Sequence, residues 1–511
     1  MKKFLLTMLV AALAMGASAK AKGQQPALQF DSNAGELRVM TMHDGTRVRY
    51  TAFERLYFVT HVEDSAYQFL NVYVPEGATQ QTPIFLRTYV GGYMASAAGQ
   101  PQTGDATGRA LQEGYVVVIP GSRGRNSTVI ANKSDKKKGI KKGQTIYTGR
   151  APAALLDLKA AIRNLRHFDS TMLGDAEHII TDGTSAGGAM SSLMGATGNN
   201  PAYEPMLQAM GAANERDDVF ASVCYCPIID LDHADMAYEW LYNGTDSRQH
   251  GDADVLAVSN ELKAQFPAYL ASLNLRTPDG ILLTADNYLD YIKSELIRSA
   301  QIAKNASADI PDSLGFVFSE EASFGAPPIN GGMTRMVGEK KPMGDRPPMM
   351  MRPGGSKRVG EYITDLDMDK YLNYVVSTQP LKTAPAFDTQ GVVGQRASGE
   401  NEEFGDSKGS SVNFTEYSSS KTGTAVSPEV ASNVALLNPM NFIGDGVTDV
   451  APHWYIRHGA RDRDTSFPVP INLALKLQNT GKDVNFLLAW NRPHSGDYAL
   501  DELFQWIKSL Q

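Results

Sequence analysis

Residues 183–188 read Gly183-Thr184-Ser185-Ala186-Gly187-Gly188 and connect a short apolar run, residues 178–181, to a segment of small residues that extends to residue 198. This pattern predicts a strand, a sharp turn with Ser185 at its tip, and a helix. Gly183 and Gly187 have no side chains, so strand and helix can approach closely enough to expose the serine hydroxyl. A motif this short also occurs by chance, and its weight therefore depends on the sequence around it.

Apolar runs and helical patterns alternate on both sides of this turn. Unbroken apolar runs are typical of strands buried in a parallel sheet, whereas apolar residues every three or four positions indicate helices. We expect an antiparallel edge at residues 36–75, strands at 83–86, 115–120, 178–181, 221–229, 453–456 and 484–489, and helices at 153–167, 186–198, 469–477 and 500–510. This alternation predicts an α/β chain with a doubly wound, mostly parallel sheet. A serine turn between a strand and a helix of such a sheet is the nucleophile elbow of an α/β-hydrolase.

A long segment interrupts the alternation. It contains helical runs at residues 255–270 and 288–303, followed by a part rich in Gly, Pro and Met. We expect the first part of a hydrolase domain at residues 20–234 and the second part at residues 381–511. Between them, we expect residues 235–380 to form an inserted lid with a flexible loop at 325–360. For the methionine cluster Met349–Met351, a poorly ordered loop is the favoured interpretation, and a surface that contacts substrate is the alternative.

Residues 1–19 have the pattern of a secretory signal. Lys2 and Lys3 precede an apolar core at residues 4–15, and Ala17-Ser18-Ala19 suits cleavage before Lys20. The apolar core is too short to anchor the chain in a bilayer, so we expect an exported protein, periplasmic or secreted, without stable membrane insertion. The formal net charge of −8 argues against a nucleic-acid partner.

The chain has two cysteines, Cys224 and Cys226. Two positions apart on a strand, both side chains point to the same face, which suits a disulfide badly. We expect two free thiols buried in the core, as is common for unpaired cysteine. Redox chemistry and a zinc site are both poorly supported.

A serine nucleophile needs a general base, and the base needs a carboxylate that orients it. In an α/β-hydrolase the acid and then the histidine follow the serine along the chain. The histidines after Ser185 are His233, His250, His453, His458 and His494. His494 lies between the last strand and the last helix, where this fold places its base, and His458 is the runner-up. The carboxylate is Asp462 or Asp464, which the sequence alone barely separates.

The oxyanion of an acyl-transfer reaction needs preorganised N–H donors. The amide of Ala186, at the start of the elbow helix, is one candidate. Gly92 or Tyr93 is the second, because Val90-Gly91-Gly92-Tyr93 follows a predicted strand as the oxyanion loop of an esterase does. A double-glycine turn without a catalytic role is the alternative. Such chemistry requires neither a metal nor a cofactor.

Six stretches together resemble the bacterial tannases, also grouped as subtype B carboxylesterases. They are Gly121-Ser122-Arg123-Gly124-Arg125, Gly149-Arg150-Ala151-Pro152-Ala153, the elbow, and residues 226–235, 456–466 and 493–498. The resemblance implies that Asp462 completes a triad with Ser185 and His494, and that Asp464 binds the phenolic ring of the substrate. It also implies a lysine and a glutamate for the ring hydroxyls, here Lys382 and Glu400. The segment before Glu400 is longer than expected, so Glu402 is the alternative.

The residue types agree with this implied substrate. A galloyl group carries three adjacent hydroxyls, and Lys382, Glu400 and Asp464 offer one donor group and two carboxylate acceptors. We therefore expect a secreted serine esterase whose partner is a small phenolic ester. The alternatives are an esterase for feruloyl or another aromatic acyl group, a serine peptidase of the prolyl-oligopeptidase type, and a non-catalytic binding module. The sequence has no propeller repeat, which disfavours the peptidase.

Overall fold

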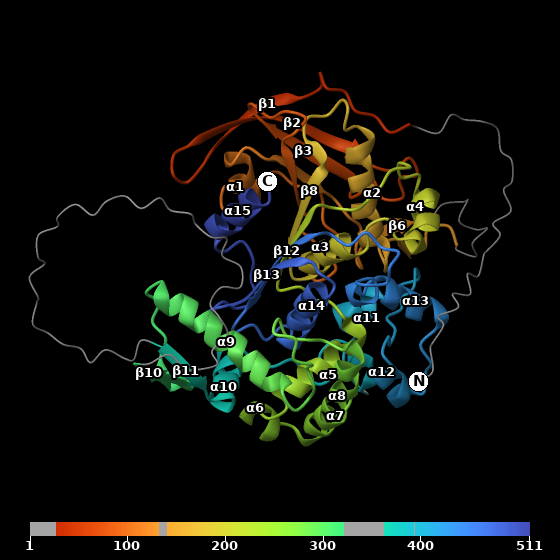
Figure 1. Ribbon diagram of the computed structural model, residues 1–511. Helices are drawn as coiled ribbons and strands as arrows, with labels where there is room; N and C mark the ends of the chain where they lie inside the picture. The colour runs from red at the N-terminus through yellow and green to blue at the C-terminus, as the bar shows by residue number, and fades with distance from the viewer. Residues whose placement is uncertain (1–26, 132–140, 321–361, 393) are drawn as a thin grey trace, which may run out of the picture.

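The computed structural model of the protein describes residues 27–131, 141–320, 362–392 and 394–511 (Figure 1). The expected signal sequence, residues 1–19, and the expected flexible loop, residues 325–360, lie outside these ranges. None of the described helices is long and apolar enough to cross a membrane.

A nine-stranded sheet forms the centre of the described chain. Its first three strands pair antiparallel, β3 pairs antiparallel with β5, and all pairings from β5 to β13 are parallel. In spatial order the strands are β1 (Glu36–Thr41), β2 (Arg47–Tyr57), β3 (Phe69–Pro75), β5 (Val116–Pro120), β4 (Pro83–Arg87), β8 (Asp175–Thr184), β9 (Ala221–Tyr225), β12 (His453–Gly459) and β13 (Asp483–Ala489). The order confirms the predicted antiparallel edge and mostly parallel sheet.

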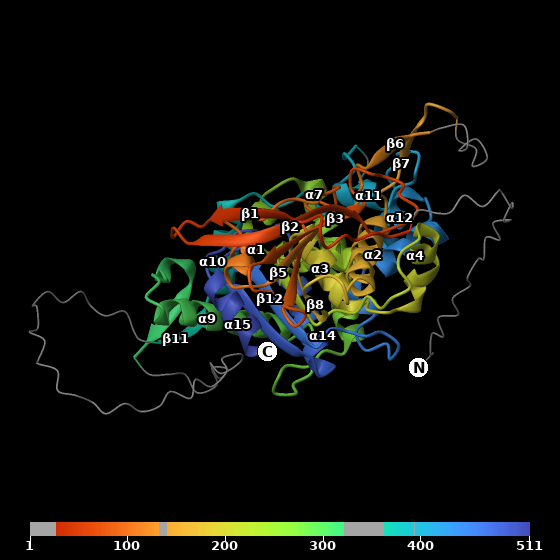
Figure 2. The same cartoon turned by 90° about the horizontal axis from the view of Figure 1, so that it is seen from above.

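Helices cover both faces of this sheet. Figures 1 and 2 show α1 (Ala106–Gln112) and α15 (Leu500–Ser509) on one side, and α2 (Ala153–His167) and α3 (Ala186–Ala196) on the other. The apolar side chains of α14 (Pro468–Asn479) join the same core as those of α2 and α3. These helices form where the sequence has apolar residues every three or four positions, and the apolar stripe of each is buried. The architecture is a doubly wound α/β-hydrolase fold.

The elements between β9 and β12 gather below the sheet in Figure 1. They are α5 (Leu231–Tyr242), α6 (Asp246–Gln249), α7 (Ala253–Lys263), α8 (Phe266–Leu273), α9 (Tyr288–Asn305), the hairpin β10 (Phe316–Ser319) and β11 (Tyr362–Leu366), α10 (Met368–Thr378), α11 (Gly399–Glu403), α12 (Glu416–Thr422) and α13 (Pro428–Leu436). The helical run expected at 255–270 is two helices, with Pro267 in the first turn of α8. Residue 235 lies inside α5, and the chain returns to the sheet at β12.

Both cysteines are free and buried, as predicted. Cys224 packs in the apolar core beside α3. The strand expected to extend to residue 229 ends at Tyr225, and Cys226 has a positive φ of 44°. The two thiols therefore do not share one face of a strand, and Cys226 turns toward the carboxyl end of the sheet, where β12 ends.

Candidate active site

Ser185 lies at a sharp turn between β8 and α3. Its φ of 63° and ψ of −123° are rare for a residue with a side chain and cost on the order of 1–3 kcal/mol. The glycines allow the turn, as the sequence predicted. A Cβ on Gly183 would lie 2.2 Å from the carbonyl oxygen of Gly187, and one on Gly188 would lie 2.5 Å from that of Tyr225. The backbone of Ser185 is fixed by a bond from its N–H to the Tyr225 carbonyl, at 2.9 Å.

Asp462 and His494 lie together at the carboxyl end of the sheet. The Nδ1 of His494 is 2.7 Å from a carboxylate oxygen of Asp462, and the other oxygen accepts the amide N–H of Asp464 at 2.8 Å. Burial alone would raise the pKa of Asp462, but the two neighbouring imidazoles and the Asp464 amide bring it down to about 2. Asp462 is therefore ionised near neutral pH and able to hold the imidazole of His494 in one tautomer.

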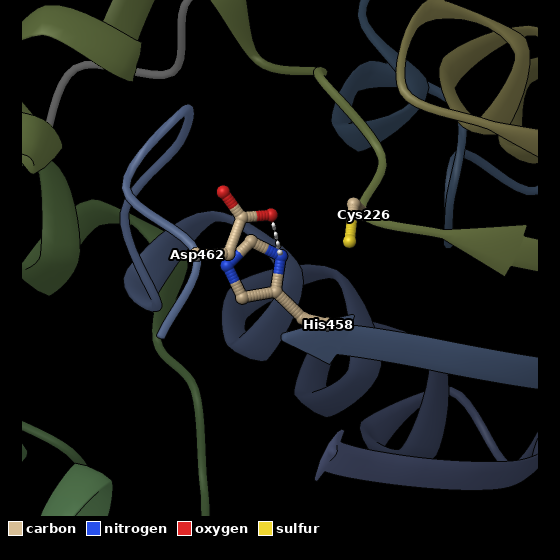
Figure 3. A group of neighbouring side chains, drawn as sticks. All are labelled: Cys226, His458 and Asp462. Carbon is tan, nitrogen blue, oxygen red and sulfur yellow. Dashed lines mark ion pairs between the residues drawn. The ribbon is translucent and has the colours of Figure 1, made fainter. Parts of the chain in front are cut away.

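His458, the runner-up for the base, also lies near Asp462, at 3.7 Å (Figure 3). Its side chain is completely buried, and neither ring nitrogen has a hydrogen-bond partner among the described residues. Burial lowers the pKa of His458, so that imidazole is neutral near pH 7. The structure thus gives the hydrogen bond with Asp462 to His494 and places His458 behind it, away from solvent.

The loop that carries His494 is pinned against the elbow. Arg87, at the end of β4, donates two hydrogen bonds to Asp497 at 2.9 and 2.7 Å. A Cβ on Gly496 would lie 1.9 Å from the hydroxyl of Thr184, the residue before Ser185. The sequence reasoning did not identify Arg87 or Asp497, although Asp497 belongs to one of the six stretches that carry the family resemblance.

The loop after β4 presents free backbone donors. Gly92 and Tyr93 both have positive φ, 55° and 56°. Their carbonyl oxygens accept hydrogen bonds from Arg125, through its Nε for Gly92 and its backbone N–H for Tyr93, both at 2.8 Å. Because the N–H and C=O of a trans peptide point in opposite directions, the Tyr93 N–H points away from Arg125. Among the described residues, the amides of Gly92, Tyr93 and Ala186 have no acceptor.

Lys382 and Asp464 both lie close to His494. Burial and the charge of Lys382 lower the pKa of His494. The hydrogen bond and charge of Asp462 and the charge of Asp464 raise it, and the net shift is upward. The Lys382 ammonium is 4.1 Å from the centre of the Phe387 ring. Two hydrogen bonds hold the backbone of Lys382. Its N–H donates to the Tyr238 hydroxyl at 3.1 Å, and its carbonyl oxygen accepts from Arg248 at 3.0 Å.

The three glutamates of α11 face different neighbours. Glu402 forms an ion pair with Arg125 and is therefore engaged. Glu400 has no hydrogen-bond partner among the described residues, and its charge contributes to raising the pKa of the buried Tyr93 hydroxyl. Glu403 is fully buried, which raises its pKa to about 8. Of the two glutamates that the sequence left open, Glu400 is the one with a free carboxylate, and its charge acts on the Tyr93 hydroxyl.

Two buried aspartates support the segment that carries Lys382. Asp235 accepts the N–H groups of Phe387 and Asp388, at 2.7 and 3.0 Å. Asp388 in turn accepts hydrogen bonds from Asn401 at 2.7 Å and from two backbone amides of the segment before α12. The sequence reasoning gave these residues no role. The only signal for Asp235 was its place in the stretch 226–235 that resembles the tannases.

Three groups of side chains could hold a metal ion among the described residues. In the first, Asp230, Asp232 and His233, the carboxylates already accept hydrogen bonds from Asn438 at 2.7 and 2.8 Å, so this group is satisfied without an ion. The second contains Asp462, Asp464 and His494. The third contains Cys226, His458 and Asp462.

Comparisons with known proteins agree with this geometry. A search of the curated proteins found no match. A family model described as BD-FAE matches residues 144–266, which include the elbow. Among solved structures, the tannin acyl hydrolase from Lactobacillus plantarum is 35% identical with a TM-score of 0.78, over 94% of this chain and 98% of that chain. The Fusobacterium nucleatum tannase is 32% identical with a TM-score of 0.76, over 95% of this chain and 99% of that chain.

A tannin acyl hydrolase in complex with ethyl gallate is also similar, with 35% identity and a TM-score of 0.77 over 94% of this chain and 98% of that chain. At this identity, and with almost the whole of each relative covered, the likeness extends beyond the fold. The resemblance found in the sequence is confirmed: the chain belongs to the tannases, the bacterial tannin acyl hydrolases, and is a carboxylic-ester hydrolase.

Proposed function

We propose that the protein is an exported serine esterase that hydrolyses galloyl esters through an acyl-enzyme. One observation carries the proposal: a buried, ionised Asp462 holds His494 in the loop that packs against the turn of Ser185. Support for the substrate comes from similar proteins whose structures contain ethyl gallate and 3,4-dihydroxybenzoate.

In this mechanism, the Oγ of Ser185 attacks the ester carbonyl while the free ring nitrogen of His494 takes its proton. Asp462 stabilises the imidazolium that forms. The carbonyl oxygen becomes an oxyanion and accepts hydrogen bonds from the unpaired amides of Ala186 and Tyr93, with Gly92 beside them. His494 then gives its proton to the departing alcohol. Water, activated by the same imidazole, attacks the acyl-enzyme and releases the phenolic acid.

The acyl group is selected by three charged side chains. The charges of Lys382 and Asp464 act on His494, and that of Glu400 acts on the Tyr93 hydroxyl. The two carboxylates accept protons of ring hydroxyls, and the ammonium donates to a ring oxygen. Asp464 also pairs with Arg463, at 3.0 Å. A ring without these hydroxyls leaves the Glu400 carboxylate without a donor, so it is rejected. Residues 235–380 are proposed to form a lid beside this pocket.

A feruloyl esterase is the second candidate, and the BD-FAE match is the observation that favours it. A methoxy group accepts hydrogen bonds but donates none, so Glu400 and Asp464 argue for the hydroxylated ring.

Hydrolysis of methyl gallate, methyl ferulate and p-nitrophenyl acetate by the purified protein tests the proposal. We expect methyl gallate to have by far the highest kcat/KM, and Ser185→Ala to reduce hydrolysis of every ester by several orders of magnitude. A preference for methyl ferulate, or a Ser185→Ala variant within tenfold of the parent, contradicts it. Export is tested separately, by locating the protein in its host and sequencing its amino terminus.

A further inference from the structure

Behind the Asp462–His494 pair lies a second cluster that the proposed mechanism does not use. It consists of Cys226, just after β9, His458, near the end of β12, and Asp462, in the loop that follows (Figure 3). The thiol, a ring nitrogen and a carboxylate oxygen of these residues lie within 4.8 Å of one another. All three side chains are completely buried.

The imidazole of this cluster is unsatisfied, whereas the Asp462 carboxylate accepts hydrogen bonds from His494 and from the Asp464 amide. Both ring nitrogens of His458 are buried without a hydrogen-bond partner among the described residues. A buried polar group without a partner is costly, and few native groups remain so without a reason. The thiol of Cys226 lies 3.4 Å from the carbonyl oxygen of Ser495 and also interacts with the Asp462 carboxylate. A positive φ at Cys226 turns this thiol out of the strand and toward the other two side chains.

We propose that Cys226, His458 and Asp462 bind a thiophilic divalent cation such as Zn²⁺ or Cd²⁺, and that the bound cation inhibits the enzyme. One sulfur, one imidazole nitrogen and one carboxylate oxygen form a ligand set that such cations accept, with water as a fourth ligand. Bonds of about 2.0 to 2.3 Å place neighbouring ligand atoms about 3.5 Å apart, so the side chains must close by at most roughly 1 Å. His458 and Asp462 are already 3.7 Å apart. On binding, the Cys226 thiol releases its proton to water, while the neutral His458 offers a lone pair directly.

Inhibition follows from the position of Asp462, and this step rests on the proposed function. Asp462 lies 2.7 Å from the Nδ1 of His494 and stabilises the imidazolium formed when Ser185 attacks. A divalent cation on the same carboxylate cancels that negative charge and places positive charge beside the imidazole. The imidazolium that forms during the attack is then no longer stabilised, and turnover falls although Ser185 and the acyl pocket are untouched. The cation is therefore an inhibitor and not a cofactor.

The loop that carries His494 covers the cluster. Ser495 contacts the thiol, whereas Asn491, Arg492 and Pro493, earlier in the same loop, are exposed. A cation reaches the cluster when this loop moves aside. The competing position, between Asp462, Asp464 and His494, lacks a sulfur and does not depend on Cys226. The two positions therefore respond differently to the loss of one thiol.

The chain offers a matched control, because Cys224 is also buried but packs beside α3, away from the cluster. Chelator-treated parent, Cys226→Ser and Cys224→Ser proteins are titrated with Co²⁺, and the thiolate-to-cobalt charge-transfer band is recorded in the near ultraviolet. Zn²⁺ is then added to displace Co²⁺, and hydrolysis of methyl gallate is measured relative to the metal-free rate of the same variant.

We expect the band and at least a tenfold Zn²⁺ inhibition in the parent and in Cys224→Ser, reversed by a chelator, and neither in Cys226→Ser. If Cys226→Ser does not fold, His458→Asn takes its place. A parent without the band, or inhibition that persists without Cys226 or His458, overturns the proposal. The band does not depend on turnover, so a protein that binds Co²⁺ but never hydrolyses methyl gallate contradicts the proposed function and leaves the cation site standing.

Discussion

The side-chain amide of Asn401 donates a hydrogen bond of 2.7 Å to the carboxylate of Asp388, and both side chains are completely buried. Asp388 ends the segment that begins at Lys382, and Asn401 directly follows Glu400. The bond therefore joins the two segments that are proposed to grip the phenolic ring from opposite sides. Such buried, fully satisfied bonds fix the position of binding groups that are themselves only partly buried.

Asp388→Asn should loosen this junction. The carboxylate accepts from Asn401, Phe414 and Thr415, and an amide retains only one acceptor oxygen. We expect the free energy of unfolding to fall by about 1.5 to 3 kcal/mol, the range for hydrogen bonds to a charged group. The KM for methyl gallate should rise more than that for p-nitrophenyl acetate. Urea unfolding and steady-state kinetics measure both effects, with the exposed Asp369→Asn as the control. An unfolding midpoint equal to that of the control contradicts the proposed junction.

Asp462→Asn and Asp464→Asn should separate the two aspartates of the Asp-Arg-Asp stretch. The hydrogen bond to His494 belongs to Asp462, so its amide variant favours the wrong tautomer and kcat should fall on the order of 10⁴-fold for every ester. Asp464→Asn should mainly raise KM for methyl gallate and weaken its preference over methyl ferulate. Steady-state kinetics on both esters gives the answer, and the opposite pattern would show that the two roles are exchanged.

The pH profile should report the charges around His494. This histidine must be neutral to take a proton, so kcat/KM rises as the pH passes its pKa. Asp464 raises that pKa and Lys382 lowers it. Asp464→Asn should therefore move the acidic limb of the kcat/KM profile to lower pH, and Lys382→Met should move it to higher pH. Profiles with p-nitrophenyl acetate, whose acyl group has no ring, isolate this effect from substrate recognition. Shifts of the same sign in both variants would contradict the arrangement.

Arg125→Gln should test the support of the oxyanion loop. Arg125 holds the Gly92 carbonyl and pairs with Glu402, so its loss frees the peptide whose N–H is proposed to face the oxyanion. One oxyanion donor is worth about 10²–10³ in kcat, and we expect a displaced donor to lose about tenfold. The loss should be equal for methyl gallate and p-nitrophenyl acetate, because the oxyanion is common to both. The exposed Arg396→Gln is the control, and a loss confined to methyl gallate would instead place Arg125 in ring recognition.

Much of this architecture was predictable because its signals are local. Apolar runs and helical spacing located the strands and four of the helices that cover the sheet, and α2 begins and ends at the predicted residues. The short helix α1 was not predicted. The ion pair of Glu402 with Arg125 was not predictable, because Arg125 lies far away in the sequence. The same holds for the bonds between Asp388 and Asn401 and between Arg87 and Asp497. The end of β9 at Tyr225 was missed because an apolar run does not reveal a change of φ at Cys226.

Lys382→Met provides the sharpest separation of a galloyl esterase from a general esterase on the same fold. Methionine keeps the length of the side chain and its contact with Phe387 but removes the ammonium that lies near His494. The binding energy from a ring hydroxyl is remote from the scissile carbonyl, so its loss should appear only with substrates that carry that hydroxyl. We expect kcat/KM for methyl gallate to fall by roughly 10- to 150-fold, which corresponds to about 1.5 to 3 kcal/mol for a charged hydrogen bond. Hydrolysis of p-nitrophenyl acetate at a pH well above the acidic limb of the kcat/KM profile should hardly change.

The exposed Lys408→Met is the control and should leave the hydrolysis of both substrates unaffected. Equal losses on both esters would indicate general damage to the site, and no loss on either would mean that Lys382 does not bind the ring.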